Sequence, residues 1–302
     1  MTTPDPLAAV SDRLAAIAAA GAARTVAVHG RDGRARSGLI WADGLVVTAE
    51  EALERDDELA ATLPDERRVA AALAGRDPGT DVALLRVETG PSEPLSPAPA
   101  EGLAPGQVAV AIGRAAHGAL AAVGAVSLVG GPWRSMRGGR LERRIRLGLR
   151  LEAEGEGGPV LDHAGRLIGM AVPGPRRQVL AIPAETIARV AEVLRTRGRV
   201  ARGYMGLALQ PVALPRGTDA AGGGHRGLIV VGLDPDGPGA RAGMLLGDVL
   251  TAWEGEPLAS VRDMLARLDP ESVGREVSLD LLRAGLPVRL KARIAERAAA
   301  AA

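Results

Sequence analysis

The sequence predicts a mainly β protein, in which a barrel or sandwich of short strands precedes a smaller unit of mixed helices and strands. Short apolar runs, such as Thr25–His29, Leu45–Thr48 and Val82–Val87, are separated by turns rich in glycine, aspartate and proline. Closely spaced strands of this kind favour antiparallel architecture over a parallel sheet with crossover helices. A less regular alternation over residues 140–151 predicts one further strand.

Two helices mark the expected domain boundaries. Leu7, Val10 and Leu14 share one face of a helix near the N-terminus. A second helix follows Pro183, since proline is tolerated in a first helical turn, and Gly198 ends it. We therefore expect an N-terminal helix within residues 1–22, a β domain over residues 23–200, a second domain over residues 201–296 and a disordered tail over residues 297–302.

The composition excludes several classes of function. A net charge of +1 gives no global attraction to nucleic acid or to a membrane. With one tyrosine, three tryptophans and no phenylalanine, the chain has little with which to stack nucleic-acid bases. The absence of cysteine excludes a disulfide, a thiolate nucleophile and a zinc–thiolate site. No motif indicates a cofactor, and we expect no nucleic-acid partner.

The N-terminal segment predicts a cytoplasmic protein. Asp5 and Asp12 precede its apolar part, and no basic stretch comes before it, unlike in a secretory signal. The apolar residues 14–23 are too few to span a bilayer, and glycines interrupt residues 115–133. We expect no membrane span; a wrongly assigned start codon would instead permit a periplasmic or otherwise extracytoplasmic location.

A glycine-rich turn, residues 154–159 (EGEGGP), leads into a short apolar strand and a hairpin. Glycines at this density let the backbone adopt positive φ and let another group approach closely. The turn resembles the nucleophile loop of trypsin-like serine proteases, whose pattern is G-x-S-G-G-P. Glu156 stands where that pattern has serine, and Glu154, Gly155 and Gly157 stand in the part that forms the oxyanion site.

Further segments extend this resemblance to the HtrA (Deg) family. They are SGLI at 37–40 with LVVT at 45–48, TDVALL at 80–85, VAVAIG at 108–113, GGP at 157–159 and AIP at 181–183. The resemblance covers about residues 25–296. It implies a chymotrypsin-like double β-barrel followed by an α+β PDZ domain, and family members commonly form trimers.

The resemblance also places the family's catalytic triad on this sequence. The aspartate falls on Asp81, the histidine on Glu51 and the serine on Glu156. Imidazole suits the proton transfers of peptide hydrolysis, and a carboxylate at Glu51 is a poorer substitute. Glu156 cannot replace serine, because its acyl product would be an anhydride, and its charge would oppose a developing oxyanion. We therefore expect a pseudoprotease.

Three clustered carboxylates repel one another, so we expect the pKa of at least one to rise. An arginine would relieve this repulsion. A divalent cation held by Glu51, Asp81 and Glu156 would do the same, since Ca²⁺ and Mg²⁺ prefer oxygen ligands. The third possibility is that the loops lie apart and the glutamates are solvated surface residues.

The segment YMGL at 204–207 resembles the carboxylate-binding loop of the family's PDZ domains. In such a loop, backbone N–H groups bind the carboxylate of a peptide C-terminus, and the peptide pairs with the strand that follows. A helix around residues 261–268 would form the other wall. The alternative is a groove that is closed or unused, because a fold does not guarantee its function. The predicted peptide-binding residues are Tyr204, Met205, Gly206, Leu207, Leu209, Val261, Met264 and Leu265.

Three functions are compatible with these features. The first is a scaffold or regulator in protein quality control, which binds peptide C-termini or unfolded segments without cleaving them. The second is an active serine endopeptidase of the HtrA class. The third is a structural subunit that assembles with an active paralogue. Glu51 and Glu156 favour the first.

Overall fold

The computed structural model describes residues 5–30, 34–53, 58–99, 101–115, 118–215 and 225–296. The chain divides into two compact units, Met1–Val200 and Ala201–Ala302. The tail predicted over residues 297–302 lies outside the described residues. Among the described helices, none combines the length and the apolar character needed to cross a bilayer.

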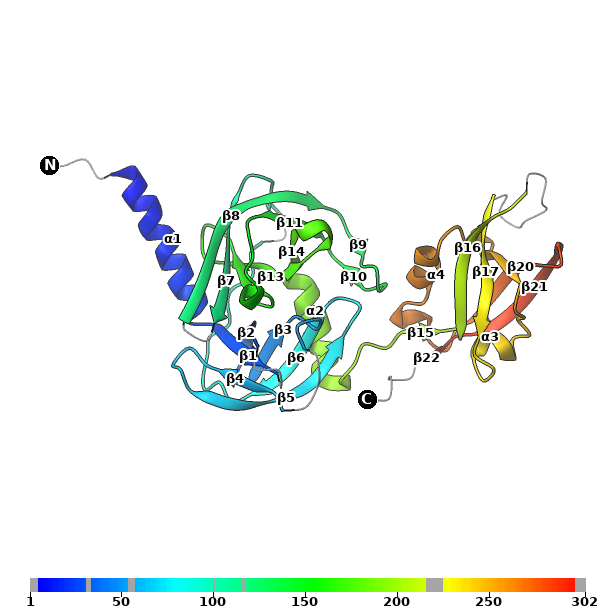
Figure 1. The fold of residues 1–302 in the computed structure, drawn as a ribbon, viewed down its shortest axis with the longest axis horizontal. Helices are drawn as coiled ribbons and strands as arrows, with labels where there is room; N and C mark the ends of the chain where they lie inside the picture. Colours follow the sequence, from blue (N-terminus) through cyan, green and yellow to red (C-terminus); the bar gives the residue numbers. More distant parts are fainter. Residues whose placement is uncertain are drawn as a thin grey trace. The chain divides into compact units, whose positions relative to one another are not determined.

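The first unit contains two closed antiparallel β-barrels of six strands each (Figure 1). The strand order is β1-β2-β3-β6-β5-β4 in the first barrel and β11-β14-β13-β12-β7-β8 in the second. This confirms the mainly β class and the double barrel. The first barrel comprises β1 (Thr25–His29), β2 (Ala35–Ala42), β3 (Leu45–Thr48), β4 (Ala60–Thr62), β5 (Arg68–Asp77) and β6 (Val82–Val87). The second comprises β7 (Val108–Ala115), β8 (Gly118–Gly130), β11 (Arg144–Gly148), β12 (Pro159–Leu161), β13 (Leu167–Pro173) and β14 (Val179–Pro183).

Aliphatic side chains fill both barrels, as a sequence without phenylalanine requires. Val26 and Val28 alternate along β1 and pack in one cluster with Leu85 of β6. In the second barrel, Ile145 and Leu147 of β11 face inward together with several alanines. Neither of these two clusters contains an aromatic side chain.

Two helices pack against the barrels. In α1 (Pro6–Ala22), the Asp5 side chain caps the first turn, and Ile17 and Gly21 are the buried residues. In α2 (Ala184–Arg197), an apolar stripe that includes Ile187 and Leu194 is buried. Gly198 ends α2 in a left-handed conformation, with φ 72°.

The segment predicted as one strand over residues 140–151 is two strands. β10 (Arg140–Leu141) pairs with β9 (Trp133–Arg134) in a small hairpin, whereas β11 belongs to the second barrel. Residues between them turn toward α2, where Glu142 binds Arg189 and Thr186. These side-chain contacts interrupt the ladder. The short strand β4 was also absent from the prediction.

The second unit is built on a sheet with the order β16-β17-β18-β20-β21, to which β19 adds at β18. Among the described strands, β16 pairs only with β17, so it forms an edge of the sheet. Ser260 and Asp263 form a capping box at the start of α4. The strands are β15 (Gly203–Tyr204), β16 (Leu207–Ala213), β17 (Arg226–Leu233), β18 (Val249–Trp253), β19 (Glu256–Pro257), β20 (Glu276–Arg283), β21 (Leu286–Arg293) and β22 (Ala295–Glu296), and the helices are α3 (Pro238–Arg241) and α4 (Val261–Arg267).

Candidate functional site

Asp81 is held by a tight turn at the end of β5. The Asp77 carboxylate accepts hydrogen bonds from the Gly79 amide at 3.1 Å and from the Thr80 hydroxyl at 2.7 Å. Asp81 itself has a φ of 58°, a left-handed conformation that aspartate tolerates better than most residues. Its Oδ1 accepts the Glu51 amide at 2.8 Å, so the turn brings Asp81 and the backbone of Glu51 together.

Glu51 and its neighbour Glu50 are paired with arginines. Glu51 Oε1 lies 3.3 Å from Nη2 of Arg137, which belongs to the β9–β10 hairpin. Glu50 is buried, and its Oε1 lies 2.6 Å from Nη2 of Arg76. Arg137 also reaches Glu50 Oε2, at 3.3 Å. The β9–β10 hairpin, which precedes strand β11 of the second barrel, is therefore tied to the acidic pair that follows β3 of the first barrel.

Glu156 lies in the glycine-rich loop and faces β2. Its Oε2 is 3.2 Å from Nε of Arg36. Its carbonyl oxygen accepts the Ser37 amide at 2.8 Å, and the Ser37 hydroxyl donates to the Glu154 carbonyl at 2.5 Å. The start of β2 therefore holds both the side chain and the backbone of this loop.

The backbone of the loop forms a one-turn 3₁₀ helix, η1 (Ala153–Gly155). The Glu156 amide donates to the Ala153 carbonyl at 3.3 Å, and the Gly157 amide donates to the Ala171 carbonyl at 2.9 Å. Gly157 has a φ of 85°, and a Cβ there would lie 2.2 Å from the Ser37 carbonyl oxygen. The amides of Glu156 and Gly157 therefore both donate to carbonyl oxygens of the protein.

Burial and charge raise two pKa values in this cluster. Desolvation, together with the charges of Glu51, Glu156 and Glu50, raises the pKa of Asp81 to about 7, although the hydrogen bond from the Glu51 amide opposes this. Desolvation also raises the pKa of Glu156, against the opposing effect of Arg36. The predicted rise in a carboxyl pKa is thus confirmed.

Arginines relieve the remaining repulsion. Arg36 pairs with Glu156, and Arg137 pairs with Glu51. Within the described residues, no group of three or more His, Asp or Glu side chains is arranged to hold a metal ion. The structure therefore brings Glu51, Asp81 and Glu156 into one cluster but gives no support to the alternative of a cation among them.

Sequence reasoning did not identify Arg36, Arg76, Arg137 or Glu50 as part of this cluster. Arg36 and Glu156 are 120 positions apart, and Arg137 and Glu50 are 87 apart. A cluster of carboxylates needs nearby cations to balance its charge. The adjacent glutamates Glu50 and Glu51 in the sequence were therefore a signal that arginines would lie close to them. Among 36 arginines, however, only the fold decides which ones lie close enough.

In the second unit, the loop before β16 is fixed by its own contacts. The Tyr204 hydroxyl donates to Asp234 Oδ2 at 2.8 Å. Gly206 has a φ of 72°, and its carbonyl accepts the Asp234 amide at 2.8 Å. The Met205 carbonyl accepts the Gly239 amide at 2.8 Å. The loop is thus anchored to the segment between β17 and α3.

The edge strand β16 lies beside α4, and side chains from both pack on one apolar cluster (Figure 1). The free edge of β16 and the neighbouring helix have the arrangement that strand addition by a peptide requires. By burial the predicted residues form two groups: Met205, Gly206 and Met264 are buried, and Tyr204, Leu207, Leu209, Val261 and Leu265 are partly exposed.

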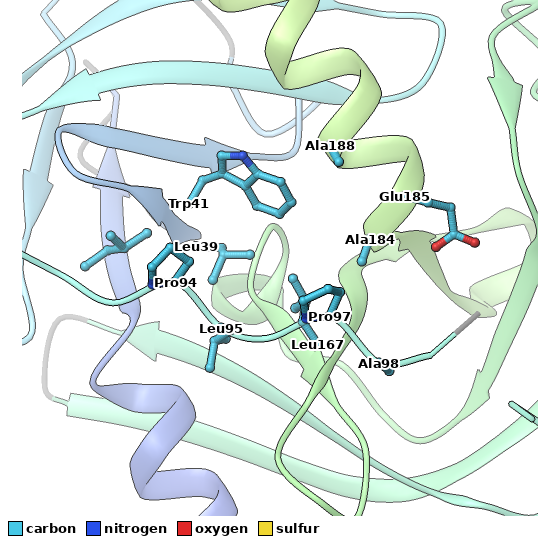
Figure 2. A pocket seen from close by; sticks show the side chains of 11 residues that line it. Leu39, Trp41, Pro94, Leu95, Pro97, Ala98, Leu167, Ala184, Glu185 and Ala188 are labelled. Carbon is cyan, nitrogen blue, oxygen red and sulfur yellow. The ribbon is translucent and has the colours of Figure 1, made fainter. Parts of the chain in front are cut away.

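A separate apolar pocket of about 520 Å³ lies in the first unit, between β2, α2 and the segment that joins the two barrels (Figure 2). Its only charged lining residue is Glu185, which accepts a hydrogen bond from Arg143 Nε at 2.7 Å. None of the acidic cluster lines it. The lining residues are Leu39, Ile40, Trp41, Pro94, Leu95, Pro97, Ala98, Leu167, Ala184, Glu185 and Ala188.

Comparison with known domains agrees with this architecture. Residues 36–170 match the trypsin-like peptidase domain, and residues 203–294 match the PDZ domain. The fold and these matches define a trypsin-like domain followed by a PDZ domain. The solved structure of the HtrA-type protease AlgW with a decapeptide superposes with a TM-score of 0.74, at 24% identity over 95% of this chain and 99% of that one. The serine endoprotease of Yersinia pestis gives a TM-score of 0.72 at 23% identity, over 98% of this chain and 100% of that one.

Comparison with named relatives indicates the protein family more specifically than the two domain matches do. A probable periplasmic serine endoprotease, DegP-like, of Halomonas elongata is 31% identical over 256 residues, covering 82% of this chain and 53% of the relative. A protein of the same name from Pseudomonas fluorescens is 28% identical over 254 residues, covering 82% of this chain and 53% of its own length. Together with the two domain matches, these relatives support the HtrA family, as the sequence predicted. The chain spans about half the length of these relatives.

The prediction of a cytoplasmic location is wrong. It depended on the absence of a recognisable signal at the N-terminus, and the relatives from both organisms are named periplasmic. An N-terminal segment alone is weak support for a location when the rest of the chain resembles proteins of another compartment.

Proposed function

We propose that the first unit has lost peptidase activity and that the chain acts by binding. Its PDZ domain would bind peptide C-termini or unfolded protein segments, and the chain would serve as a scaffold or regulator in protein quality control. The names of its relatives favour a periplasmic location for this activity.

The observation that carries this proposal is the carboxylate at the position of the nucleophile. Glu156 forms an ion pair with Arg36, and its own amide donates to the Ala153 carbonyl. Acyl transfer needs a hydroxyl or thiol beside a base, together with amides directed at the developing oxyanion. Glu156 supplies no such nucleophile, its amide is engaged, and Glu51 replaces the imidazole base.

The PDZ groove supports the binding half of the proposal. Gly206 has the left-handed conformation that turns a loop at the head of β16, and β16 has a free edge. A peptide would add to this edge with its carboxylate at the loop, while Leu207 and Leu209 favour an apolar C-terminal residue. Peptides with a charged last residue should therefore bind more weakly.

The alternative is an active serine endopeptidase, which the names of the relatives favour. Only about half the length of those relatives is matched by this chain, and their names describe the longer proteins. We give priority to the chemistry of Glu51 and Glu156, because a family name does not supply a missing nucleophile. A trimer remains a proposal from family resemblance.

Digestion of unfolded casein distinguishes the two functions. The unaltered chain and Glu156→Ala should leave casein intact. The double variant Glu51→His/Glu156→Ser restores the residues of the triad, and Glu51→His/Glu156→Ala is its matched control without a nucleophile. Cleavage by the first double variant but not the second would show that Asp81 still lies in a working geometry. Cleavage by the unaltered chain that persists in Glu156→Ala would contradict the proposal.

A further inference from the structure

A pocket of about 450 Å³ in the second unit carries positive charge at its rim, and we call it the basic pocket. It lies between α3, the start of β20, the end of β21 and β22 (Figure 1). None of the residues predicted to bind a peptide lines it. The charged residues that line it are Arg241, Glu276, Lys291 and Arg293.

The rim of the basic pocket holds three cations and one carboxylate. Lys291 and Arg293 alternate along β21 with the buried Ala292, so both side chains point to the outer face of the sheet. Glu276 lies opposite Arg293 in the ladder, but its carboxylate is 3.3 Å from Nζ of Lys291. Within the described residues, Arg241 and Arg293 are exposed and form no ion pair. The rim therefore has two guanidinium groups available to an anion.

The floor of the basic pocket is apolar. Pro238 and Ile294 are buried, and Ala242 and Ala295 beside them are partly exposed. These four side chains carry no hydrogen-bonding group, so only the rim can bind a charged group. The volume lies in the range of pockets that hold small organic molecules. A ligand that fits both parts is an organic anion, with its charged group at the rim and an apolar body on the floor.

Backbone hydrogen bonds fix the walls of the basic pocket. The Gly239 amide of α3 donates to the Met205 carbonyl at 2.8 Å, which holds this helix in place beside β21. On the other side, β22 pairs with β15, where Ala295 lies opposite Tyr204. The pocket is therefore formed before a ligand binds, and binding does not have to order its walls.

We propose that the basic pocket binds a small organic phosphate monoester, with Arg241 and Arg293 on the phosphate and the organic part on the apolar floor. Guanidinium groups bind phosphate with two parallel hydrogen bonds and are less strongly hydrated than an ammonium group. A phosphate monoester carries close to two negative charges at neutral pH. This charge matches the excess of cations at the rim better than the single charge of a carboxylate does. Such binding depends neither on peptidase activity nor on the peptide groove.

Acetylation of Lys291 tests the proposal, because Lys291 is the only lysine of the chain and lies at the rim. Its side chain is 74% exposed, so an N-hydroxysuccinimide ester of acetate should modify it in the full chain. Mass spectrometry of the proteolytic peptide separates this product from modification of the N-terminal amine. A phosphate bound beside Lys291 should slow the reaction, since a neighbouring negative charge favours the unreactive ammonium form.

Phenyl phosphate is the probe, and the concentration that halves the rate of acetylation at constant ionic strength measures its affinity. Inorganic phosphate should require a concentration about tenfold higher, because it leaves the apolar floor uncovered. Phenol, which has the ring without the phosphate, should not protect Lys291. Equal protection by inorganic phosphate and phenyl phosphate, or no protection by either, would overturn the proposal.

In Arg241→Gln/Arg293→Gln, protection should require about tenfold more phenyl phosphate, since each exposed ion pair contributes up to about fivefold. The matched control is Arg226→Gln/Arg262→Gln, which removes two exposed arginines of the same unit that do not line the pocket. It should leave the protecting concentration unchanged. An equal shift in the two variants would mean that only net charge matters and would overturn the proposal. Protection by a hexaglutamate peptide at lower concentration than by phenyl phosphate would also overturn it.

Discussion

The acidic cluster of the first unit and the groove of the second differ in what they retain. At the cluster, the barrels bring the three expected positions together, but two of them carry glutamate, and arginines neutralise these charges. In the second unit, Gly206 has a positive φ, and among the described strands β16 pairs only with β17; these are the backbone features that the proposed peptide binding uses. The acidic cluster thus shows that a fold can bring positions together independently of the chemistry of their side chains.

The two regions are also stabilised differently. The acidic cluster depends on ion pairs, one of them between the buried Glu50 and Arg76. The groove depends on backbone hydrogen bonds around glycines, such as that between the Asp234 amide and the Gly206 carbonyl. Removing a charge should therefore affect the acidic cluster more than the loop around Gly206.

The largest effect is expected from Arg76→Ala. The Glu50 side chain is only 7% exposed, and loss of this partner leaves a buried carboxylate that Arg137 alone cannot fully compensate. We expect the free energy of unfolding to fall by about 3–5 kcal/mol, measured by urea denaturation. The control is Arg67→Ala, because its pair with Asp65 is exposed and its loss should change the free energy of unfolding far less. An equal loss of unfolding free energy in the two variants would mean that the buried pair of Glu50 and Arg76 stabilises the fold no more than the exposed pair does.

The next effect is a dependence of stability on pH. The folded chain holds a proton on Asp81 up to about pH 7, whereas the unfolded chain releases it near the ordinary pKa of 3.8. The stability that this proton gives is complete below about pH 4 and is lost as the pH rises through 7, by up to about 4 kcal/mol. Asp81→Asn keeps the acceptor for the Glu51 amide but cannot ionise.

Urea denaturation at about pH 5 and pH 7.5 measures this dependence. Burial lowers the pKa of His29, which therefore acts in the opposite direction over this range of pH. The comparison is therefore between the unaltered chain and Asp81→Asn at each pH. The variant should gain stability relative to the unaltered chain as the pH rises. A difference that stays constant with pH would show that Asp81 titrates normally.

The smallest expected effect on stability comes from Gly206→Ala. A Cβ at Gly206 would lie 3.0 Å from the Asp234 side chain, and its φ of 72° disfavours alanine by about 1–2 kcal/mol. Gly255 is a matched control, since its φ is 81° and nothing lies within 4 Å. Both variants should lose stability, but only Gly206→Ala should weaken binding of an apolar C-terminal peptide, by at least about tenfold in fluorescence anisotropy. If Gly206→Ala and Gly255→Ala bound the peptide with equal affinity, the C-terminal carboxylate of the peptide would not bind at the Gly206 loop.

The class of fold could be predicted from the sequence because it depends on local patterns of apolar residues and turns. Strands such as Thr25–His29 and Val82–Val87 have the bounds that their apolar runs predicted, and Gly198 ends α2. The break between β10 and β11 was missed, because it depends on contacts between Glu142 and α2. Such contacts join segments more than forty residues apart, and no local pattern records them.

The candidate site could likewise be predicted only in part, where local sequence patterns determine it. The positions of Glu51, Asp81 and Glu156 could be aligned from short motifs, and their like charge predicted a rise in a carboxyl pKa, although burial is the larger cause of the rise at Asp81. The sequence could not show that Arg36 and Arg137 balance these negative charges, because any of the 36 arginines could have lain close to the cluster. The engagement of the Glu156 amide by Ala153 was equally hidden, since it is a property of backbone conformation.

The most direct test of binding without cleavage follows both events in one sample. An unfolded, fluorescently labelled polypeptide with an apolar C-terminus is incubated with the full chain, and anisotropy reports binding while mass spectrometry reports its length. We predict that the polypeptide is bound, that Gly206→Ala weakens this binding, and that its mass remains unchanged. Fragments that accumulate with the unaltered chain and also with Glu156→Ala would contradict the account, because a nucleophile other than residue 156 would then be at work.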